Sequence, residues 1–184
     1  MTTLHEKEKP FTSGEEEQFE QLIESTPTVI PIADINPKAQ IAVPIGRQVP
    51  LAGIGSLDLL FLDDTGTLLI VECKLVQNPE QRREVVAQLQ EYASFITSRW
   101  NASRILEIAD EHAKQTGLIS WFHLFKNAYK MAKISQDAQI EEKTIKRRIE
   151  RNHLRGPILI VAANRFEERA LVLVDYLRRN KFEI

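Results

Sequence analysis

The sequence predicts an α/β domain in which a central mixed β-sheet is flanked by helices. Short apolar runs of strand character alternate with longer segments of helical period, in the order helix, strand, hairpin, helix, helical segment, strand, helix. The chain has 184 residues, 43% of them hydrophobic and 27% charged, which is an ordinary globular composition. We therefore expect one domain over 1–184, with a helical insertion at 101–155 and a flexible N-terminus at 1–12.

Composition also limits the partners. The formal net charge is −2, so any contact with nucleic acid must come from a local basic patch. Cys73 is the only cysteine, which excludes a disulfide within the chain and fits a reducing, cytoplasmic location. The N-terminal residues are polar and include no apolar stretch as long as a signal peptide or a membrane span, so no membrane partner is expected.

The first helix is expected to begin at Ser13, which fits a capping box with Glu16, and to end before Pro27. Its predicted apolar face consists of Phe19, Leu22 and Ile23. Glu20 lies near the edge of that face. A first strand is expected further along the chain, at 41–49.

A β-hairpin is the clearest local pattern in the chain. Apolar runs at 57–62 and 68–71 flank a polar turn, and Gly66 suits the left-handed position that closes the three-residue loop 64–66. Counting back from Asp63 opposite Thr67 pairs Leu62 with Leu68, Leu60 with Ile70, and Asp58 with Glu72.

This register places Asp58, Glu72 and Lys74 on one face, because side chains alternate along a strand. Carboxylates directly opposite each other repel, and the neighbouring residues are apolar, so we expect Asp58 and Glu72 to share a cation or a proton. Two carboxylates and a lysine are the parts of a site at which a hard metal ion activates water beside a phosphate.

A second long helix is predicted to begin at the pair Asn78-Pro79 and to bury one residue per turn. The buried stripe consists of Val85, Leu89, Tyr92 and Ile96. Gln88 precedes Tyr92 by one turn and points toward the sheet. Its partner is either the site around Lys74 or the backbone, since a buried glutamine needs a hydrogen bond.

Segment 101–155 contains no proline and is expected to be helical throughout. Its apolar cluster is expected either in the core or in the surface of a homodimer, and consists of Trp121, Phe122, Leu124 and Phe125. His123 is expected to be a hydrogen-bonded structural residue. An apolar strand buried on both faces at 157–163 and an amphipathic helix at 166–179 complete the predicted elements.

Cations that could contact DNA occur in three places. Arg47, at the end of the first strand, is either a phosphate contact or a solvated edge residue. Arg82 and Arg83 open the second long helix, the end at which the helix dipole disfavours cations. The basic run at 143–155 gathers Lys143, Arg147 and Arg151 on one helical face. That face would either follow a phosphate backbone or form a solvated surface.

The series Asp58, Glu72-Cys73-Lys74 and Gln88 to Tyr92 resembles the D … E-x-K … Q-x-x-x-Y motifs of the PD-(D/E)XK nuclease superfamily, in its RecB-like branch. The stretch 45–96 is similar to the nuclease domain of NucS-like mismatch endonucleases. The proline that often precedes the aspartate in this superfamily is replaced here by leucine. The resemblance implies a restriction-endonuclease-like three-layer fold with a central mixed sheet.

The resemblance also implies a site and an activity. Asp58, Glu72 and the carbonyl of Cys73 would bind Mg²⁺ or Mn²⁺, with no small-molecule cofactor, and Lys74 would orient or deprotonate the attacking water. Gln88 and Tyr92 would complete the catalytic set. A glutamate on the first helix reaches the metal in these nucleases, which points to Glu20; the alternative is a solvated helix residue.

The expected function is Mg²⁺-dependent hydrolysis of phosphodiester bonds in DNA, in a DNA-repair context. Two alternatives stay open. The chain is then either a nuclease-fold module that binds DNA or protein without catalysis, or a structural domain in which Lys74 pairs with Glu72. Ion binding at the hairpin separates the nuclease from the structural domain, and DNA cleavage separates it from the silent module.

Overall fold

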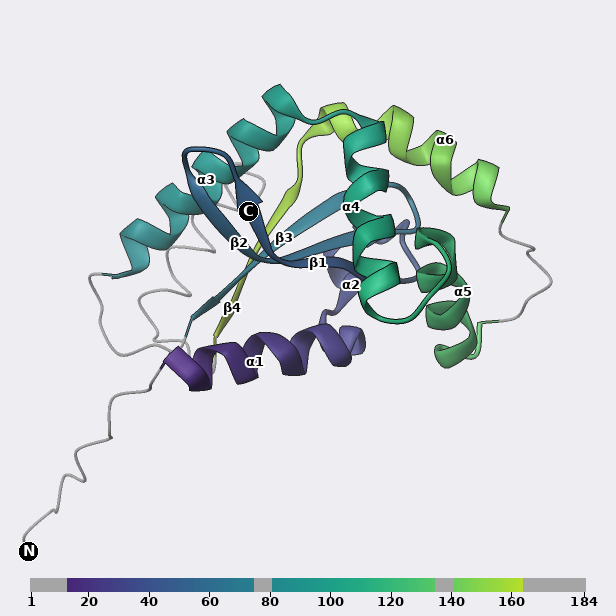
Figure 1. Cartoon of the computed structure of the whole chain (residues 1–184), viewed down its shortest axis with the longest axis horizontal. Helices are drawn as coiled ribbons and strands as arrows, with labels where there is room; N and C mark the ends of the chain where they lie inside the picture. Colours follow the sequence, from purple (N-terminus) through teal and green to yellow (C-terminus); the bar gives the residue numbers. More distant parts are fainter. Residues whose placement is uncertain (1–12, 75–80, 135–140, 164–184) are drawn as a thin grey trace, which may run out of the picture.

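The computed structural model of the chain describes residues 13–74, 81–134 and 141–163 (Figure 1). Its helical elements are α1 Ser13–Ser25, η1 Pro27–Val29, α2 Ile32–Ile35, α3 Gln81–Arg99, α4 Ala102–Gln115, α5 Trp121–Met131, α6 Glu142–Asn152 and η2 His153–Arg155. Its strands are β1 Ala42–Leu51, β2 Gly55–Asp63, β3 Leu68–Lys74 and β4 Ile158–Ala163. The helix predicted at 166–179 and the helix start predicted at Asn78 lie outside the described residues.

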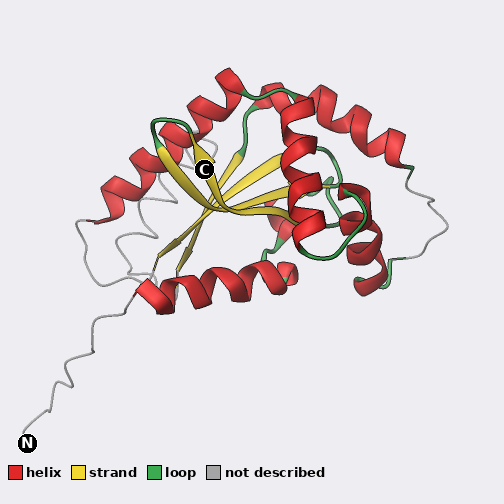
Figure 2. Cartoon of the chain, viewed as in Figure 1, coloured by secondary structure: helices red, strands yellow, loops and turns green. Residues whose placement is uncertain are grey.

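The strands form one mixed sheet in the order β1-β2-β3-β4 (Figure 2). β1, β2 and β3 are antiparallel neighbours, whereas β3 and β4 run parallel. The predicted α/β class with a central mixed sheet is therefore confirmed. None of the described helices combines the length and apolar composition that a membrane span requires.

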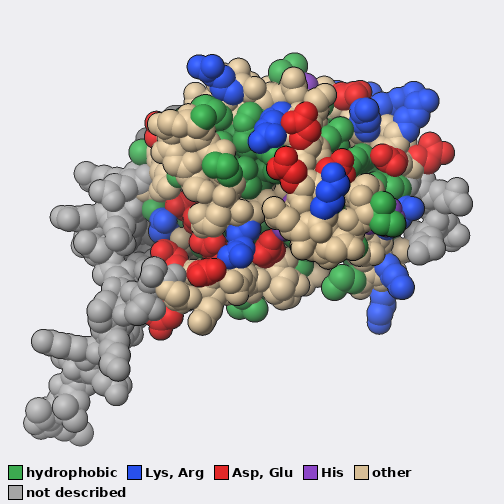
Figure 3. All heavy atoms as spheres, in the orientation of Figure 1, with side chains coloured by type: hydrophobic (Ala, Val, Ile, Leu, Met, Phe, Trp, Pro, Cys, Tyr) green, Lys and Arg blue, Asp and Glu red, His purple; other side chains and the backbone are tan. Residues whose placement is uncertain are grey.

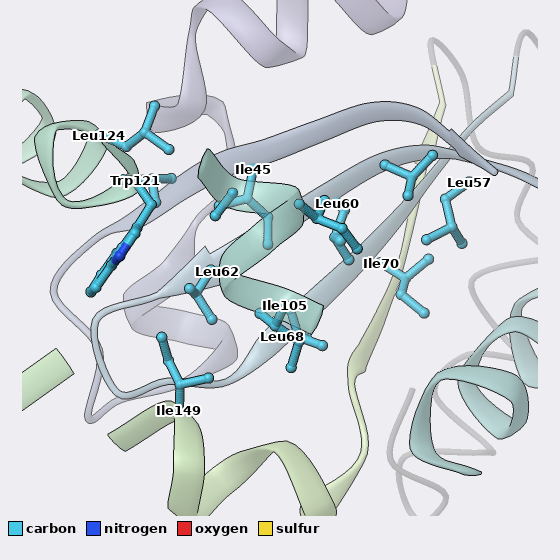
Figure 4. Close-up of a cluster of buried hydrophobic side chains, with 14 of the residues drawn as sticks. Ile45, Leu57, Leu60, Leu62, Leu68, Ile70, Ile105, Trp121, Leu124 and Ile149 are labelled. Atoms are coloured by element: carbon cyan, nitrogen blue, oxygen red, sulfur yellow. The ribbon is translucent and has the colours of Figure 1, made fainter. Parts of the chain in front are cut away.

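Helices cover both faces of the sheet (Figure 1). On one face, Ile23 of α1 joins the inward side chains of the strands, among them Phe61 and Val71. On the other face, α3, α4, α5 and α6 pack on a larger cluster that contains Leu60 and Ile70 (Figure 4). Because consecutive residues of β2 and β3 point to opposite covered faces, both strands are apolar without interruption where they pair, at 59–62 and 68–71.

The predicted hairpin register is confirmed where strands β2 and β3 pair. Leu60 lies opposite Ile70, and Leu62 lies opposite Leu68. Gly66 has a φ of 83° and closes the turn, with its N–H donating to the carbonyl oxygen of Asp63 at 3.0 Å. The turn chemistry read from the sequence therefore determined the register.

Helix α6 packs against the turn between β2 and β3. A Cβ atom on Gly66 would collide with the backbone of Arg148 and Ile149. Arg148 Nη1 and Asn152 Nδ2 of α6 each donate to a turn carbonyl, of Asp64 and Thr65 respectively, at 2.6 Å. Glycine at this position thus serves both a positive φ and a close approach of the helix backbone.

Three expectations about the elements need correction. Leu22 does not belong to the buried face of α1, because its side chain is 57% exposed while Glu20 takes a buried position. Segment 101–155 is not continuously helical: α4 ends before Gly117, whose φ is 78°, and α5 and α6 follow separately. Strand β4 is half-buried along its whole length, since it lies at the edge of the described sheet.

The predicted buried stripe of the second long helix is confirmed, as Val85, Leu89, Tyr92 and Ile96 are all buried. The aromatic residues of α5 pack in the core, and Trp121 meets Phe125 edge to face with ring centroids 6.0 Å apart. His123 Nδ1 lies 3.0 Å from Ser120 Oγ, which fits the expected structural role. Helices α4 to α6 thus build one layer of the domain.

Candidate functional site

Asp58 lies where strands β2 and β3 stop pairing. The last paired residues before it are Leu59 and Val71. Beyond this pair, the Asp58 side chain, and not the backbone of β2, accepts a hydrogen bond from β3. Asp58 Oδ2 accepts a hydrogen bond of 2.8 Å from the backbone N–H of Cys73. The alternation of faces also breaks at this point, since Leu57 belongs to the larger cluster and Leu59 to the smaller one.

Glu72 is the most buried charged side chain of the site, with 1% of its surface exposed. Lys74 Nζ lies 2.7 Å from Glu72 Oε1, and apart from this ion pair neither carboxylate oxygen has a hydrogen-bond partner among the described residues. Burial, followed by the charge of Asp58, raises the pKa of Glu72 to about 7, against the opposing effect of Lys74. The carboxyl therefore has unsatisfied acceptor capacity and a high affinity for a proton.

Lys74 completes this cluster from the same strand. Burial lowers the pKa of Lys74, but the hydrogen bond with Glu72 and the charges of Glu72 and Asp58 outweigh burial, so its pKa is raised overall. The side chain is 28% exposed, so the ammonium stays both charged and open to solvent. It can therefore donate to an incoming anion while it holds Glu72.

Glu20 of α1 belongs to the same end of the sheet. Its side chain is buried, and both carboxylate oxygens accept from Gln48 Nε2 at 2.9 Å. Gln48 Nε2 also lies 3.4 Å from Asp58 Oδ1. Burial raises the pKa of both carboxyl groups, and hydrogen bonds oppose that rise. The reading of Glu20 as a solvated helix residue is therefore wrong.

The sequence provided no indication of Gln48, a residue of β1. Arg47 pairs with Leu59 and Val49 with Leu57, so Gln48 lies directly opposite Asp58. Its φ is 50°, a left-handed backbone conformation that costs a residue with a side chain roughly 1–2 kcal/mol. A polar residue opposite the aspartate could have been found once the first strand was aligned with the hairpin, but its backbone conformation could not.

Gln88 and Tyr92 lie beside the site. Gln88 Nε2 donates to the hydroxyl oxygen of Tyr92 at 2.6 Å, and this hydroxyl donates to the carbonyl oxygen of Ser56 at 3.0 Å. The pair therefore anchors the start of β2, two residues before Asp58. In the described contacts, Gln88 is joined to this tyrosine and not to Lys74.

Among the basic candidates whose side chains are described, none is gathered at the carboxylates. Arg47 is ion-paired with Glu17 at 3.5 Å and Glu24 at 3.2 Å, so its charge is used to join β1 to α1. The side chains of Arg82 and Arg83 lie outside the described residues.

The exposed cations of α6 include Lys143, Arg147 and Arg151, and Lys and Arg side chains gather on the surface over this helix (Figure 3). Helix α6 is held at the hairpin turn by Arg148 and Asn152. Strand β3 begins beside the turn at Leu68 and reaches Glu72 four residues later, a rise of about 13 Å. The basic helix and the carboxylates therefore occupy opposite ends of the hairpin.

The donor chemistry suits a hard divalent cation. Two carboxylates and the Cys73 carbonyl supply oxygen, and the unpartnered oxygens of Glu72 are what such an ion would satisfy. In residues 13–74, 81–134 and 141–163, no group of three or more His, Cys, Asp and Glu side chains is close enough to hold a metal ion. An ion held here would keep several water ligands, as Mg²⁺ commonly does.

Comparison with family models, curated proteins and solved structures finds no match for this chain. The interpretation of the site therefore depends on its residues and their geometry.

Proposed function

We propose that the chain is a divalent-metal-dependent nuclease that hydrolyses phosphodiester bonds of DNA, with a restriction-endonuclease-like fold. The observation that supports this most is the buried Glu72 carboxylate, which has unpartnered oxygens and lies beside Asp58 and Lys74 at the splayed end of a hairpin. A carboxylate is kept at 1% exposure only where a cation, a proton or hydrogen bonds compensate it.

In this proposal, Asp58, Glu72 and the Cys73 carbonyl would hold Mg²⁺ or Mn²⁺. A bound ion of this kind polarises a phosphoryl oxygen and lowers the pKa of water. Lys74 keeps its ammonium partly open to solvent, where it can contact a scissile phosphate or orient the attacking water. Glu20 and Gln48 lie next to Asp58, and Tyr92 anchors the strand that carries it.

The exposed face of α6 would bind the DNA backbone away from the cleavage site. Lys143, Arg147 and Arg151 are exposed, and the neighbouring Arg148 is held at the turn by its hydrogen bond to the carbonyl oxygen of Asp64. A separation of about 13 Å along the hairpin corresponds to about four base pairs of B-DNA. DNA held at both ends would therefore need to extend at least that far from the cut.

The test is a cleavage assay on single-stranded, duplex, flap and mismatched DNA with Mg²⁺ or Mn²⁺. The parent should cut at least one substrate, and Glu72→Gln should abolish cutting. Lys74→Met should keep Mn²⁺ binding but lose about a hundredfold or more in rate, the scale of a lost acid–base or electrostatic group. Glu107→Gln, an exposed change of the same kind on α4, should have no effect.

The outcomes separate the rival functions. Mn²⁺ binding by calorimetry without cleavage of any substrate would indicate a silent nuclease-fold module. Absence of Mn²⁺ binding would make the Lys74–Glu72 ion pair a structural feature and overturn the proposal.

A further inference from the structure

Gln48, in the middle of β1, is the only described residue other than glycine that has a positive φ within a helix or strand. Only two described residues other than glycine have a positive φ, and Lys133 is the other, just after the end of α5. A left-handed φ of 50° lies outside the range of strand residues, so it does not serve the hydrogen bonds between β1 and β2. Strain of this kind persists where the surrounding structure compensates it, and it is common at functional sites.

The side chain of Gln48 shows what the strained backbone achieves. Its amide nitrogen lies 2.9 Å from each oxygen of Glu20 and 3.4 Å from Oδ1 of Asp58. A glutamine amide has two N–H donors, so one nitrogen can serve a carboxylate on α1 and a carboxylate on β2 together. The donor is neutral, so it joins two anions without adding a charge that would compete with a bound cation.

Without this amide, nothing in the described contacts would hold Glu20 against the strand. Burial disfavours the ionised carboxylate, and the nearby Asp58 repels it. The other polar contacts of α1 with β1 among the described residues come from Arg47, which binds Glu17 and Glu24, and its charge favours ionised Glu20 only from outside hydrogen-bonding contact. The amide of Gln48 is therefore the link that brings the α1 carboxylate to the end of the hairpin.

We propose that Gln48 is a positioning residue: its amide holds the Glu20 carboxylate beside Asp58, so that α1 contributes to the metal site. This inference rests on the proposed metal-dependent function. It assigns a role to a residue of the first strand that carries no reactive group of its own. Its effect should therefore pass through Glu20.

The test uses two substitutions that relieve backbone strain and remove the contact. Gln48→Asn keeps the amide and suits a left-handed conformation, but it is one methylene too short to span the same contacts. Gln48→Gly removes both the strain and the side chain. Gln115→Asn, the same change at an exposed residue near the end of α4, is the control. Each protein is measured for urea unfolding, Mn²⁺ affinity by calorimetry, and DNA cleavage at saturating Mn²⁺.

We expect both Gln48 variants to stay folded, because relief of the backbone strain offsets part of the lost hydrogen bonds, and yet to cleave DNA at least tenfold more slowly. Mn²⁺ affinity should fall in the same variants, and Gln115→Asn should match the parent in all three measurements. Adding Glu20→Gln to Gln48→Asn should cause little further loss, because the two residues act as one unit. A purely structural role would lower stability alone and would leave the Mn²⁺ affinity and the cleavage rate of the folded variants at the parent values.

Two results would overturn the inference, and they can be told apart. If the parent binds Mn²⁺ and cleaves DNA, while Gln48→Asn does both equally well, Gln48 has no positioning role and the proposed function stands. If the parent neither binds Mn²⁺ nor cleaves DNA, the proposed function fails, and the role of Gln48 in it fails as well.

Discussion

Glu72 illustrates how one buried carboxyl can link stability to function. Its pKa is raised from 4.5 to about 7, so the folded chain retains a proton that the unfolded chain releases between those values. The folded state therefore binds more protons in that range, and the free energy of unfolding must decrease as the pH rises through it. The same burial that makes ionised Glu72 costly in the folded state would make a bound cation stabilising, because the cation compensates the carboxylate charge.

This linkage gives a prediction for Glu72→Gln. The contribution of the parent carboxyl is complete below pH 4.5 and is lost by about pH 7. The variant should therefore gain stability relative to the parent between pH 5 and pH 8, by up to about 3 kcal/mol. Urea unfolding of both ion-free proteins across this range measures the difference. Parallel curves for variant and parent would show that Glu72 ionises normally, and Glu107→Gln should run parallel to the parent.

At the scale of elements, the contact between α6 and the hairpin turn determines where the basic surface lies. The turn is bound by Arg148, Asn152 and Tyr129, whose hydroxyl donates to Asp64 Oδ2 at 2.6 Å. Gly66 allows the helix backbone to approach. Gly66 therefore both closes the hairpin and allows α6, a helix much later in the chain, to pack against the turn.

Two glycine substitutions separate these roles. Gly66→Ala adds a Cβ both at a φ of 83° and against the backbone of α6. Gly53→Ala adds one at a φ of 81° with no atom within 4 Å. Both should lose stability through backbone strain, and Gly66→Ala should lose at least about 1 kcal/mol more, because α6 must shift. Urea unfolding of the two variants measures this; equal losses would mean that α6 accommodates the added methyl group.

If the basic face of α6 binds DNA, the affinity for DNA should depend on the salt concentration through this face. Changing three of the exposed cations of α6 to glutamine should weaken binding of all DNA sequences alike, and the changed residues are Lys143, Arg147 and Arg151. The slope of log affinity against log salt should flatten by about one unit per lost phosphate contact. Fluorescence anisotropy at several salt concentrations measures the slope, and Mn²⁺ affinity should not change.

A control for the α6 variant removes the same charge elsewhere. Its substituted residues are exposed and lie on α3, α4 and α5: Arg99, Lys114 and Lys130. If both triple variants flatten the slope equally, the effect is one of net charge and α6 is not a specific DNA contact. If neither does, the α6 face is a solvated surface.

For the whole molecule, ion binding should stabilise the folded domain, because the site exists only where β2 and β3 are brought together. A ligand that binds the folded state alone at one hundred times its dissociation constant adds about 2.7 kcal/mol. We expect Mn²⁺ to produce such an increase in the parent and in Glu107→Gln, and none in Asp58→Asn. Urea unfolding with and without Mn²⁺ measures it. Equal stabilisation of Asp58→Asn would place the bound ion elsewhere.

Much of the fold was predictable from local patterns. The hairpin register, the left-handed Gly66 and the buried stripe from Val85 to Ile96 follow from turn chemistry and from the spacing of apolar residues. The adjacency of Glu72 and Lys74 follows from strand alternation. These features depend on residues close together in the chain, so the sequence by itself determined them.

The tertiary structure alone decided how distant residues complete or leave the site. Glu20 is buried and Leu22 exposed because α1 is rotated so that its carboxylate meets Gln48 across the sheet. Arg47 forms an ion pair with Glu24 of α1. The basic run lies at the turn end of the hairpin because α6 packs against the turn. Each outcome depends on contacts between segments far apart in sequence, which helical and strand periodicity do not encode.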